Sequence, residues 1–160
     1  MSRTITNYHS QFFSPEESTE LYNKLKSRLV WQDGVYSSKA RCITRKAHAM
    51  DTIPESIEEA EIHSFVARAL DTIGSHKGIS GIYVNYYRNG NDWAPAHSHP
   101  GHRQLVISLG AARQLRIGKK IYEMSNGDVI TFGSGIHEII RDPAITEGRI
   151  SIAVFILNDV

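Results

Sequence analysis

The sequence has little of what marks a secreted, membrane or nucleic-acid-coating protein. One cysteine, Cys42, among 160 residues excludes an intramolecular disulfide and gives no support for secretion. No apolar run approaches the roughly 20 residues that a membrane-spanning helix needs, and the first residues lack the apolar core of a signal peptide. The net charge of +1, with histidine counted as neutral, provides no global basic field for nucleic acid. We therefore expect an intracellular protein without a membrane partner.

The rest of the composition is that of an ordinary globular domain. Hydrophobic residues make up 41% of the chain and charged residues 22%, which is usual for a soluble fold. A chain of this length is large enough for one hydrophobic core. With no internal repeat, long linker or low-complexity segment, we expect a single domain over 1–160. Its helical part would cover 1–79 and its β core 80–160.

The N-terminal half predicts two helices. Ser14 is a plausible N-cap, proline follows it at the first helical position, and Glu17 stands at the capping-box position. Apolar residues at helical spacing follow, so we expect a helix over 15–30. A second amphipathic helix would open at Pro54 and end at Gly74.

From about residue 80 the pattern changes to short strands separated by tight turns. Such a series predicts a sandwich or jelly roll, with the two helices packed on one outer face. The expected fold class is mainly β with flanking N-terminal helices, or α+β. The seven expected strands cover 81–87, 103–109, 112–117, 120–124, 128–132, 135–140 and 149–156.

Three histidines and one arginine are the candidates for chemistry. His97 and His99 lie one residue apart on an extended segment, so their side chains point to the same side. Neutral imidazole is the commonest protein ligand for a transition metal. His137 follows further along the chain, and Arg149 is a lone cation in an apolar C-terminal strand. These residues indicate an iron site with an anionic co-substrate. Solvent-exposed histidines, and an arginine paired with an acidic side chain, remain the alternatives.

The order and approximate spacing of these residues resemble those of the AlkB-like Fe(II)/2-oxoglutarate-dependent dioxygenases. The match covers 81–156. That family has a double-stranded β-helix, a relative of the jelly roll, which agrees with the strand pattern. The residues that carry the resemblance are Asn85-x-Tyr87, Gly90, Asp92, His97-x-His99, Ser108-Leu-Gly110, Gly127-Asp128, His137 and Arg149.

The resemblance implies a role for each matched position. His97 and His137 match two iron ligands, Asn85 and Tyr87 match residues that contact 2-oxoglutarate, and Arg149 matches the arginine that pairs with its distal carboxylate. Fe(II) sites of this class use two histidines and one carboxylate and leave the other positions open. A planar guanidinium holds a carboxylate through two parallel hydrogen bonds. The implied cofactor is Fe(II), the implied co-substrate is 2-oxoglutarate, and no catalytic residue is expected beyond the metal ligands.

The chain departs from the family pattern at two positions. His99 stands where the family's His-x-Asp motif has its aspartate, and Phe155 stands where the family has a second arginine. We expect His99 to complete a three-histidine site with His97 and His137, where the metal keeps one more unit of positive charge. Asp92 is interpreted as a turn residue and not as the missing carboxylate ligand.

Three hypotheses for function follow. The first is a dioxygenase that hydroxylates a C–H or N-methyl group, which in this family is often on an alkylated nucleic-acid base. Arg41, Arg45 and Lys46, in a polar segment (32–53) expected to be an exposed loop or hairpin, would then contact phosphates; a solvated polar loop is the equally open alternative. The second is a catalytically altered or silent jelly roll that binds metal, a ligand or a partner. The third is a three-histidine, cupin-like metal dioxygenase that needs no 2-oxoglutarate.

Overall fold

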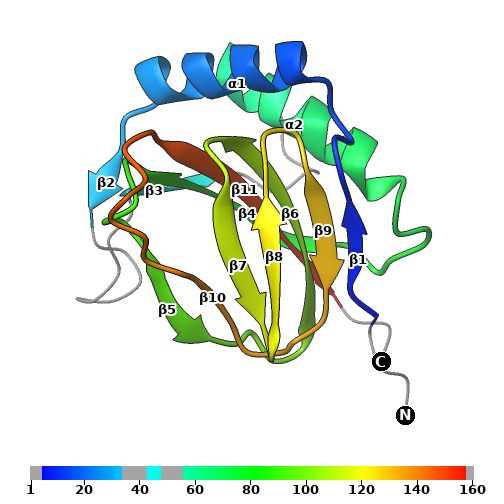
Figure 1. The fold of residues 1–160 in the computed structure, drawn as a ribbon. Coiled ribbons are helices and arrows are strands. Elements are labelled where there is room, and N and C mark those ends of the chain that lie inside the picture. The colour runs from blue at the N-terminus through cyan, green and yellow to red at the C-terminus, as the bar shows by residue number, and fades with distance from the viewer. Residues whose placement is uncertain (1–4, 34–42, 48–55, 158–160) are drawn as a thin grey trace.

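A computed structural model describes residues 5–33, 43–47 and 56–157 of the chain, which form two helices and a set of antiparallel strands (Figure 1). In chain order the elements are β1 (Asn7–His9), α1 (Pro15–Arg28), β2 (Gln32–Asp33), β3 (Ile43–Ala47), α2 (Ile57–Leu70), β4 (Ile79–Tyr87), β5 (Ala94–His97), β6 (His102–Gly110), β7 (Arg113–Ile117), β8 (Lys120–Met124), β9 (Val129–Phe132), β10 (His137–Ile139) and β11 (Arg149–Leu157).

The strands form two sheets that face each other. The larger sheet has seven strands in the order β1-β9-β6-β11-β4-β3-β2, and the smaller sheet has four in the order β5-β10-β7-β8. Every pairing is antiparallel. From β4 to β11 the chain passes back and forth between the two sheets, which is the winding of a jelly roll or double-stranded β-helix. The expected fold class is confirmed.

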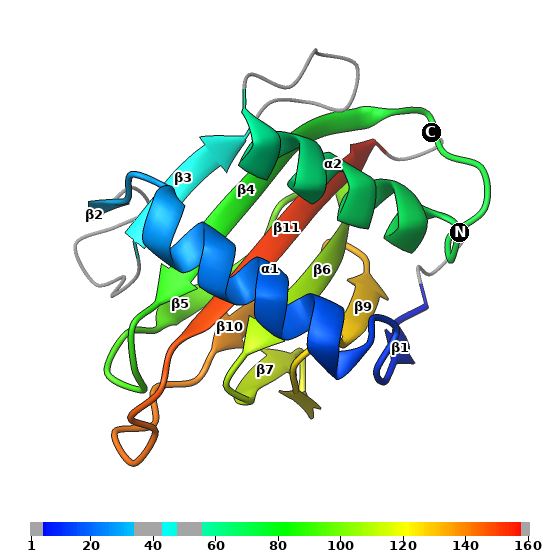
Figure 2. The same ribbon diagram turned by 90° about the horizontal axis from the view of Figure 1, so that it is seen from above.

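Both helices cover the outer face of the larger sheet (Figure 2). α1 begins with the predicted capping box: the side chain of Ser14 accepts a hydrogen bond from the amide of Glu17, and the Glu17 carboxylate accepts one from the amide of Ser14. Glu17 also forms a two-pronged ion pair with Arg68 of α2, at 2.8 and 3.1 Å. The start of α1 is therefore fastened to the neighbouring helix.

Alternation of side chains along the strands separates two apolar clusters. One cluster lies between the helices and the larger sheet and includes Leu21, Val66 and Ile107. The other lies between the two sheets and includes Tyr87, Leu115 and Phe132. The strands β4, β6, β9 and β11 of the larger sheet send alternate side chains to the two clusters. The cluster between the two sheets surrounds the candidate site.

Two features of the fold differ from the sequence-based expectations. One is that β1 and β5 were not predicted as strands. In the segment 32–53, expected to be a loop or hairpin, β2 and β3 pair with each other and extend the larger sheet through β4, which agrees with the hairpin alternative. The second difference is the start of the second helix. α2 begins at Ile57 with Ser56 as its N-cap, whereas Pro54 lies outside the described residues. Within the described residues, neither helix is long and apolar enough to cross a membrane.

Candidate metal and co-substrate site

The inner face of the larger sheet carries the site because three neighbouring strands place matching side chains in rows. β11 lies between β4 and β6 and is paired with both along its length. Residues two apart on a strand share a face. The four rows, each in the order β4, β11, β6, are Tyr87, Arg149, Gly110; Asn85, Ser151, Ser108; Tyr83, Ala153, Val106; and Gly81, Phe155, Gln104.

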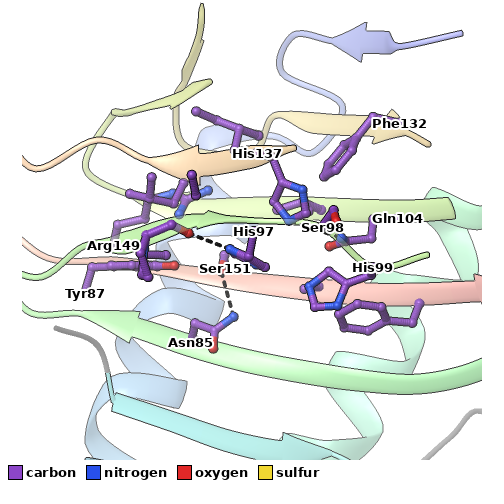
Figure 3. A pocket seen from close by; sticks show the side chains of 18 residues that line it. Asn85, Tyr87, His97, Ser98, His99, Gln104, Phe132, His137, Arg149 and Ser151 are labelled. Atoms are coloured by element: carbon purple, nitrogen blue, oxygen red, sulfur yellow. Dashed lines mark hydrogen bonds between the residues drawn. The ribbon is translucent and has the colours of Figure 1, made fainter. Parts of the chain in front are cut away.

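The three predicted histidines come together opposite these rows. His97 ends β5 and His137 begins β10, and the two residues are direct partners across the antiparallel pair. His99 follows just beyond β5. Their candidate ligand nitrogens all lie within 4.8 Å of one another, and the close-up view shows the three rings converging (Figure 3). Three convergent imidazoles at this separation suit one transition metal ion.

Backbone carbonyls orient two of the three rings. Nδ1 of His97 lies 2.6 Å from the carbonyl oxygen of Pro95, and Nδ1 of His137 lies 3.0 Å from that of Gly135. A carbonyl only accepts, so in both rings Nδ1 carries the proton and Nε2 carries the free lone pair. Fixing the tautomer through the second ring nitrogen is how proteins usually prepare histidine ligands.

Burial keeps two of the histidines neutral. It lowers the pKa of His137 to about 4; the hydrogen bond to Gly135 opposes this shift, while His97 and His99 lower the pKa further. Burial also lowers the pKa of His99, with smaller contributions from His97 and His102. A metal binds the neutral form of a histidine ring. At neutral pH, His137 and His99 therefore do not have to release a proton before they bind a metal.

Arg149 is a buried cation with unused donors. Its side chain is 1% exposed, and its Nε donates to Oγ of Ser108 at 2.7 Å. Among the described residues, Nη1 and Nη2 are buried and find no hydrogen-bond partner. Burial lowers the pKa of Arg149 to about 10, with Tyr87 raising it and Arg113 lowering it, so the group stays protonated at neutral pH. Two unused donors on a buried guanidinium are a costly arrangement without an anion.

Polar side chains next to Arg149 extend this end of the site. The amide of Asn85 lies 3.5 Å from Oγ of Ser151, and both line the cavity together with Tyr87. The Arg149 guanidinium lies 5.4 Å from the centre of the Tyr87 ring. On the same ring lies Arg113, whose guanidinium carbon is 5.5 Å from the centre. Both buried cations therefore lie against the ring of Tyr87.

The two cations have different surroundings. Nη1 and Nη2 of Arg113 donate to three backbone carbonyls, those of Asn89, Asp92 and Ile140, at 2.8 to 3.2 Å. Arg113 therefore ties loops together, and Arg149 is the one of this pair whose terminal nitrogens are available to a ligand.

One cavity of about 410 Å³ joins the histidines to Arg149. In Figure 3, Arg149 and Tyr87 lie at one end of the labelled group and His99 at the other. Most of the remaining lining is apolar. It consists of Ala94, Pro95, Ala96, Val106, Leu115, Phe132, Ile139, Ala153 and Phe155, with Ser98 and Gln104 as further polar groups. A mainly apolar cavity with a few convergent polar groups is typical of a small-molecule site.

The two residues that depart from the family pattern, His99 and Phe155, lie in contact in the structure. Phe155 packs edge-on against His99, with ring centres 4.7 Å apart, and lies 5.1 Å from Tyr83. Phe155 therefore forms an apolar wall beside the third histidine. Among the described residues, the cluster of candidate ligands contains histidines alone and no carboxylate.

Other predicted residues lie elsewhere. Asp92 is a turn residue, as expected: its carboxylate accepts from the backbone and guanidinium of Arg88 at 2.7 to 2.9 Å. Arg45 and Lys46 lie on β3, opposite Val84 and Tyr83 of β4. Arg41 lies outside the described residues. Substrate contacts by these three basic residues stay a prediction.

Sequence reasoning did not assign Gln104, Ser108, Ser151 and Arg113 to the site or its support. A signal for the first three was present. Ser151 lies two residues after Arg149 on one strand, and Gln104 and Ser108 share one face of β6. The carbonyl contacts of Arg113 come from loops, which strand alternation does not predict.

Comparison with known proteins supports the fold. No protein-family model matches the chain, and no curated protein matches it in sequence. Among solved structures, a prolyl-4-hydroxylase from Pseudomonas putida is similar with a TM-score of 0.70 at 11% identity, over 97% of this chain and 93% of that one. A prolyl hydroxylase from Trichoplax adhaerens, in complex with a hypoxia inducible factor peptide fragment, gives 0.62 at 14% identity, over 96% and 84%.

A 2OG-Fe(II) oxygenase-family oxidoreductase from Burkholderia pseudomallei gives a TM-score of 0.67 at 17% identity, over 95% of this chain and 84% of that one. All three likenesses cover nearly the whole chain. They do not single out the AlkB-like branch that the motif order resembles. The chain therefore has the jelly-roll fold seen in the 2OG-Fe(II) oxygenases.

Proposed function

We propose that this protein is an Fe(II)- and 2-oxoglutarate-dependent dioxygenase that hydroxylates a C–H bond. The observation that carries the proposal is the presence of two complementary groups in one cavity. Three convergent imidazoles could hold one metal ion, and at the other end a buried guanidinium has no hydrogen-bond partner for Nη1 and Nη2 among the described residues. One metal and one dicarboxylate would suit the two groups.

The residues present fit these two groups. His97 and His137 offer Nε2 lone pairs held in place by their Nδ1 hydrogen bonds, and His99 is the third donor. Arg149 would receive the distal carboxylate of 2-oxoglutarate in a two-pronged pair, while Asn85, Tyr87 and Ser151 contact the rest of it. A site without a carboxylate ligand keeps the full charge of the metal, which favours a dianionic co-substrate.

Each part of the cavity would then have a task. Fe(II) with 2-oxoglutarate supplies the oxidising chemistry, in which oxygen is reduced, 2-oxoglutarate becomes succinate and carbon dioxide, and one oxygen atom enters a substrate C–H bond. Ser108 holds the Arg149 side chain through Nε and so aims its two terminal nitrogens. Leu115, Ile139 and Phe132 exclude water from the space between the two ends.

The substrate class is a finer part of the proposal. Hydroxylation of an N-methyl group would release formaldehyde and demethylate an alkylated base, as the AlkB-like motif order suggests. An enzyme that acts on a paired base must flip the base into its site. A peptide side chain is the competing substrate suggested by the prolyl hydroxylases. A panel of methylated single-stranded oligonucleotides and proline-containing peptides, followed by mass spectrometry, separates these two classes.

The experiment that tests the activity measures 2-oxoglutarate consumption and succinate formation with added Fe(II). We expect both to depend on the metal and to disappear in His97→Ala. Metal binding without 2-oxoglutarate turnover would favour the catalytically silent jelly roll. Oxygen consumption without 2-oxoglutarate would favour the three-histidine, cupin-like enzyme. His99 and Phe155 are the observations that keep these alternatives in the test.

A further inference from the structure

Gln104 has a buried carboxamide in mostly apolar surroundings, where a polar side chain has few partners. It lies on β6 and is 4% exposed. Its partners across the sheet are Phe155 on β11 and Phe132 on β9, so its carboxamide lies in apolar company. Its Nε2 lies 3.2 Å from Nε2 of His137. Among the described residues, no other group makes a hydrogen bond with this side chain. A buried polar group with so few partners calls for a reason.

The contact with His137 involves the atom that a metal needs. Nδ1 of His137 donates to Gly135, so Nε2 of the neutral ring is an acceptor and the Gln104 amide is its donor. A metal bound to His137 would take this lone pair and remove the hydrogen bond. The amide would then face the metal directly, as Figure 3 shows Gln104 beside the converging rings.

We propose that Gln104 is a fourth, displaceable metal ligand that binds through its carboxamide oxygen. Turning the carboxamide over exchanges its nitrogen for its oxygen at nearly the same position, since the two atoms are almost equal in size. Two donor atoms at right angles on a metal, each about 2.1 Å from it, are about 3 Å apart. The observed separation from Nε2 of His137 is 3.2 Å, close to this spacing, so rotation of the carboxamide away from the Nε2 lone pair would place its oxygen beside a metal bound there.

The chemistry of an amide suits a ligand that leaves. The inference rests on the metal site of the proposed function. Three histidines and Gln104 would leave two positions of a six-coordinate metal open, one fewer than that function uses. A neutral amide oxygen is a weak donor and can give up its place when the co-substrate and substrate are bound. Gln104 would thus complete the resting metal site in place of the absent carboxylate.

The test is a titration of the full-length protein with Fe(II) under anaerobic conditions, repeated with Co(II). Gln104→Leu keeps the size of the side chain and removes its donors, and we expect it to weaken metal affinity by roughly ten-fold or more. Gln104→Glu supplies an anionic oxygen and should strengthen affinity by about as much. The absorption spectrum of bound Co(II) should also differ between the parent and Gln104→Leu. Gln114→Leu, at an exposed position on β7, is the matched control and should bind metal like the parent.

If Gln104→Leu remains folded and binds either metal as tightly as the parent or more tightly, the amide only blocks the site and the proposal is wrong. Gln104→Glu then serves as a second measurement, because an unchanged affinity there would also contradict it. His97→Ala separates this failure from a failure of the proposed function. If the parent binds no metal that depends on His97, the histidine site itself is misassigned; if it does, only the role of Gln104 has failed.

Discussion

Arg149 and Arg113 are equally buried and differ in how their terminal nitrogens are paired. Nη1 and Nη2 of Arg113 donate to backbone carbonyls, whereas the same two nitrogens of Arg149 have no hydrogen-bond partner within the part of the chain that the structure describes. Removing Arg113 would leave three backbone carbonyls without their donors, whereas removing a buried cation whose terminal nitrogens have no partner relieves a desolvation cost. The pair therefore distinguishes a structural arginine from one kept for a ligand.

We expect Arg149→Met to raise the free energy of unfolding by about 1 kcal/mol or more in the absence of anions, and Arg113→Met to lower it by about 2 kcal/mol or more. Urea unfolding of the metal-free proteins measures both.

In the metal-loaded protein, Arg149→Met should weaken 2-oxoglutarate binding by roughly ten-fold or more. Arg149→Lys should recover part of this loss, because an ammonium makes no two-pronged contact. Loss of stability in Arg149→Met, with unchanged 2-oxoglutarate binding, would make Arg149 a structural residue.

His137 links stability to pH. Its pKa is about 4 in the folded protein and about 6.5 in the unfolded chain, so between these values the unfolded chain binds more protons. Stability is therefore fully present above pH 6.5 and falls as the pH drops toward 4, by an amount on the order of 3 kcal/mol. Urea unfolding of the metal-free protein at pH 7 and pH 5 measures the loss. His137→Gln should lose less between the two pH values, and an identical loss in parent and variant would rule out His137 as the source.

His99 is the test of the altered ligand set. His99→Asp would place a carboxylate beside Phe155, where burial raises its pKa and costs stability in the metal-free protein. Bound metal would offset that cost, and the anionic ligand should raise metal affinity by roughly ten-fold or more and raise 2-oxoglutarate turnover. Metal titration and a succinate assay check the two effects. If the variant binds Fe(II) but turns over no faster than the parent, His99 does not limit activity.

Strands and turns position these side chains, and a pair of glycines tests how. Gly127 and Gly118 both have positive φ, at 90° and 59°. A Cβ at Gly127 would lie 2.4 Å from the backbone oxygen of Phe13 and 2.8 Å from Oγ of Ser18, whereas a Cβ at Gly118 meets nothing within 4 Å. Gly127 therefore allows the turn before β9 to approach the start of α1 closely.

We expect Gly118→Ala to cost about 1 kcal/mol of stability, from backbone strain alone, and Gly127→Ala to cost at least about 2 kcal/mol more. Thermal or urea unfolding of the two variants gives the difference. Equal losses would mean that the contact between this turn and α1 contributes little.

An element could be predicted where the sequence carries a clear signal for it, such as capping residues, an apolar run or a regular alternation. α1 and the long strands β4, β6 and β11 were predicted because capping residues and apolar runs mark them. β5 was missed because Pro95 and two alanines are poor strand formers. Its position at the edge of the smaller sheet tolerates a proline there. β1 was missed because a three-residue edge strand carries almost no periodicity.

Six residues singled out in the sequence line one cavity in the structure, but the geometry of that cavity was not predictable. Strand alternation placed Asn85 with Tyr87 and His97 with His99, and the structure brings His137 to them. The contact between Gln104 and His137, the unused nitrogens of Arg149 and the wall formed by Phe155 depend on how two sheets face each other, and no local pattern encodes that. The basic residues expected to bind phosphate stay a prediction.

We expect a dicarboxylate and a metal to bind together in the cavity between the sheets. Anaerobic calorimetric titration of 2-oxoglutarate into the Fe(II)-loaded protein, compared with the metal-free protein, tests it most directly. We predict one equivalent of 2-oxoglutarate per chain with metal present, and an affinity weaker by roughly ten-fold or more without metal, because only Arg149 and its polar neighbours would then hold the co-substrate. Equal affinity in the two forms, or no binding in either, would contradict a shared site for the metal and 2-oxoglutarate.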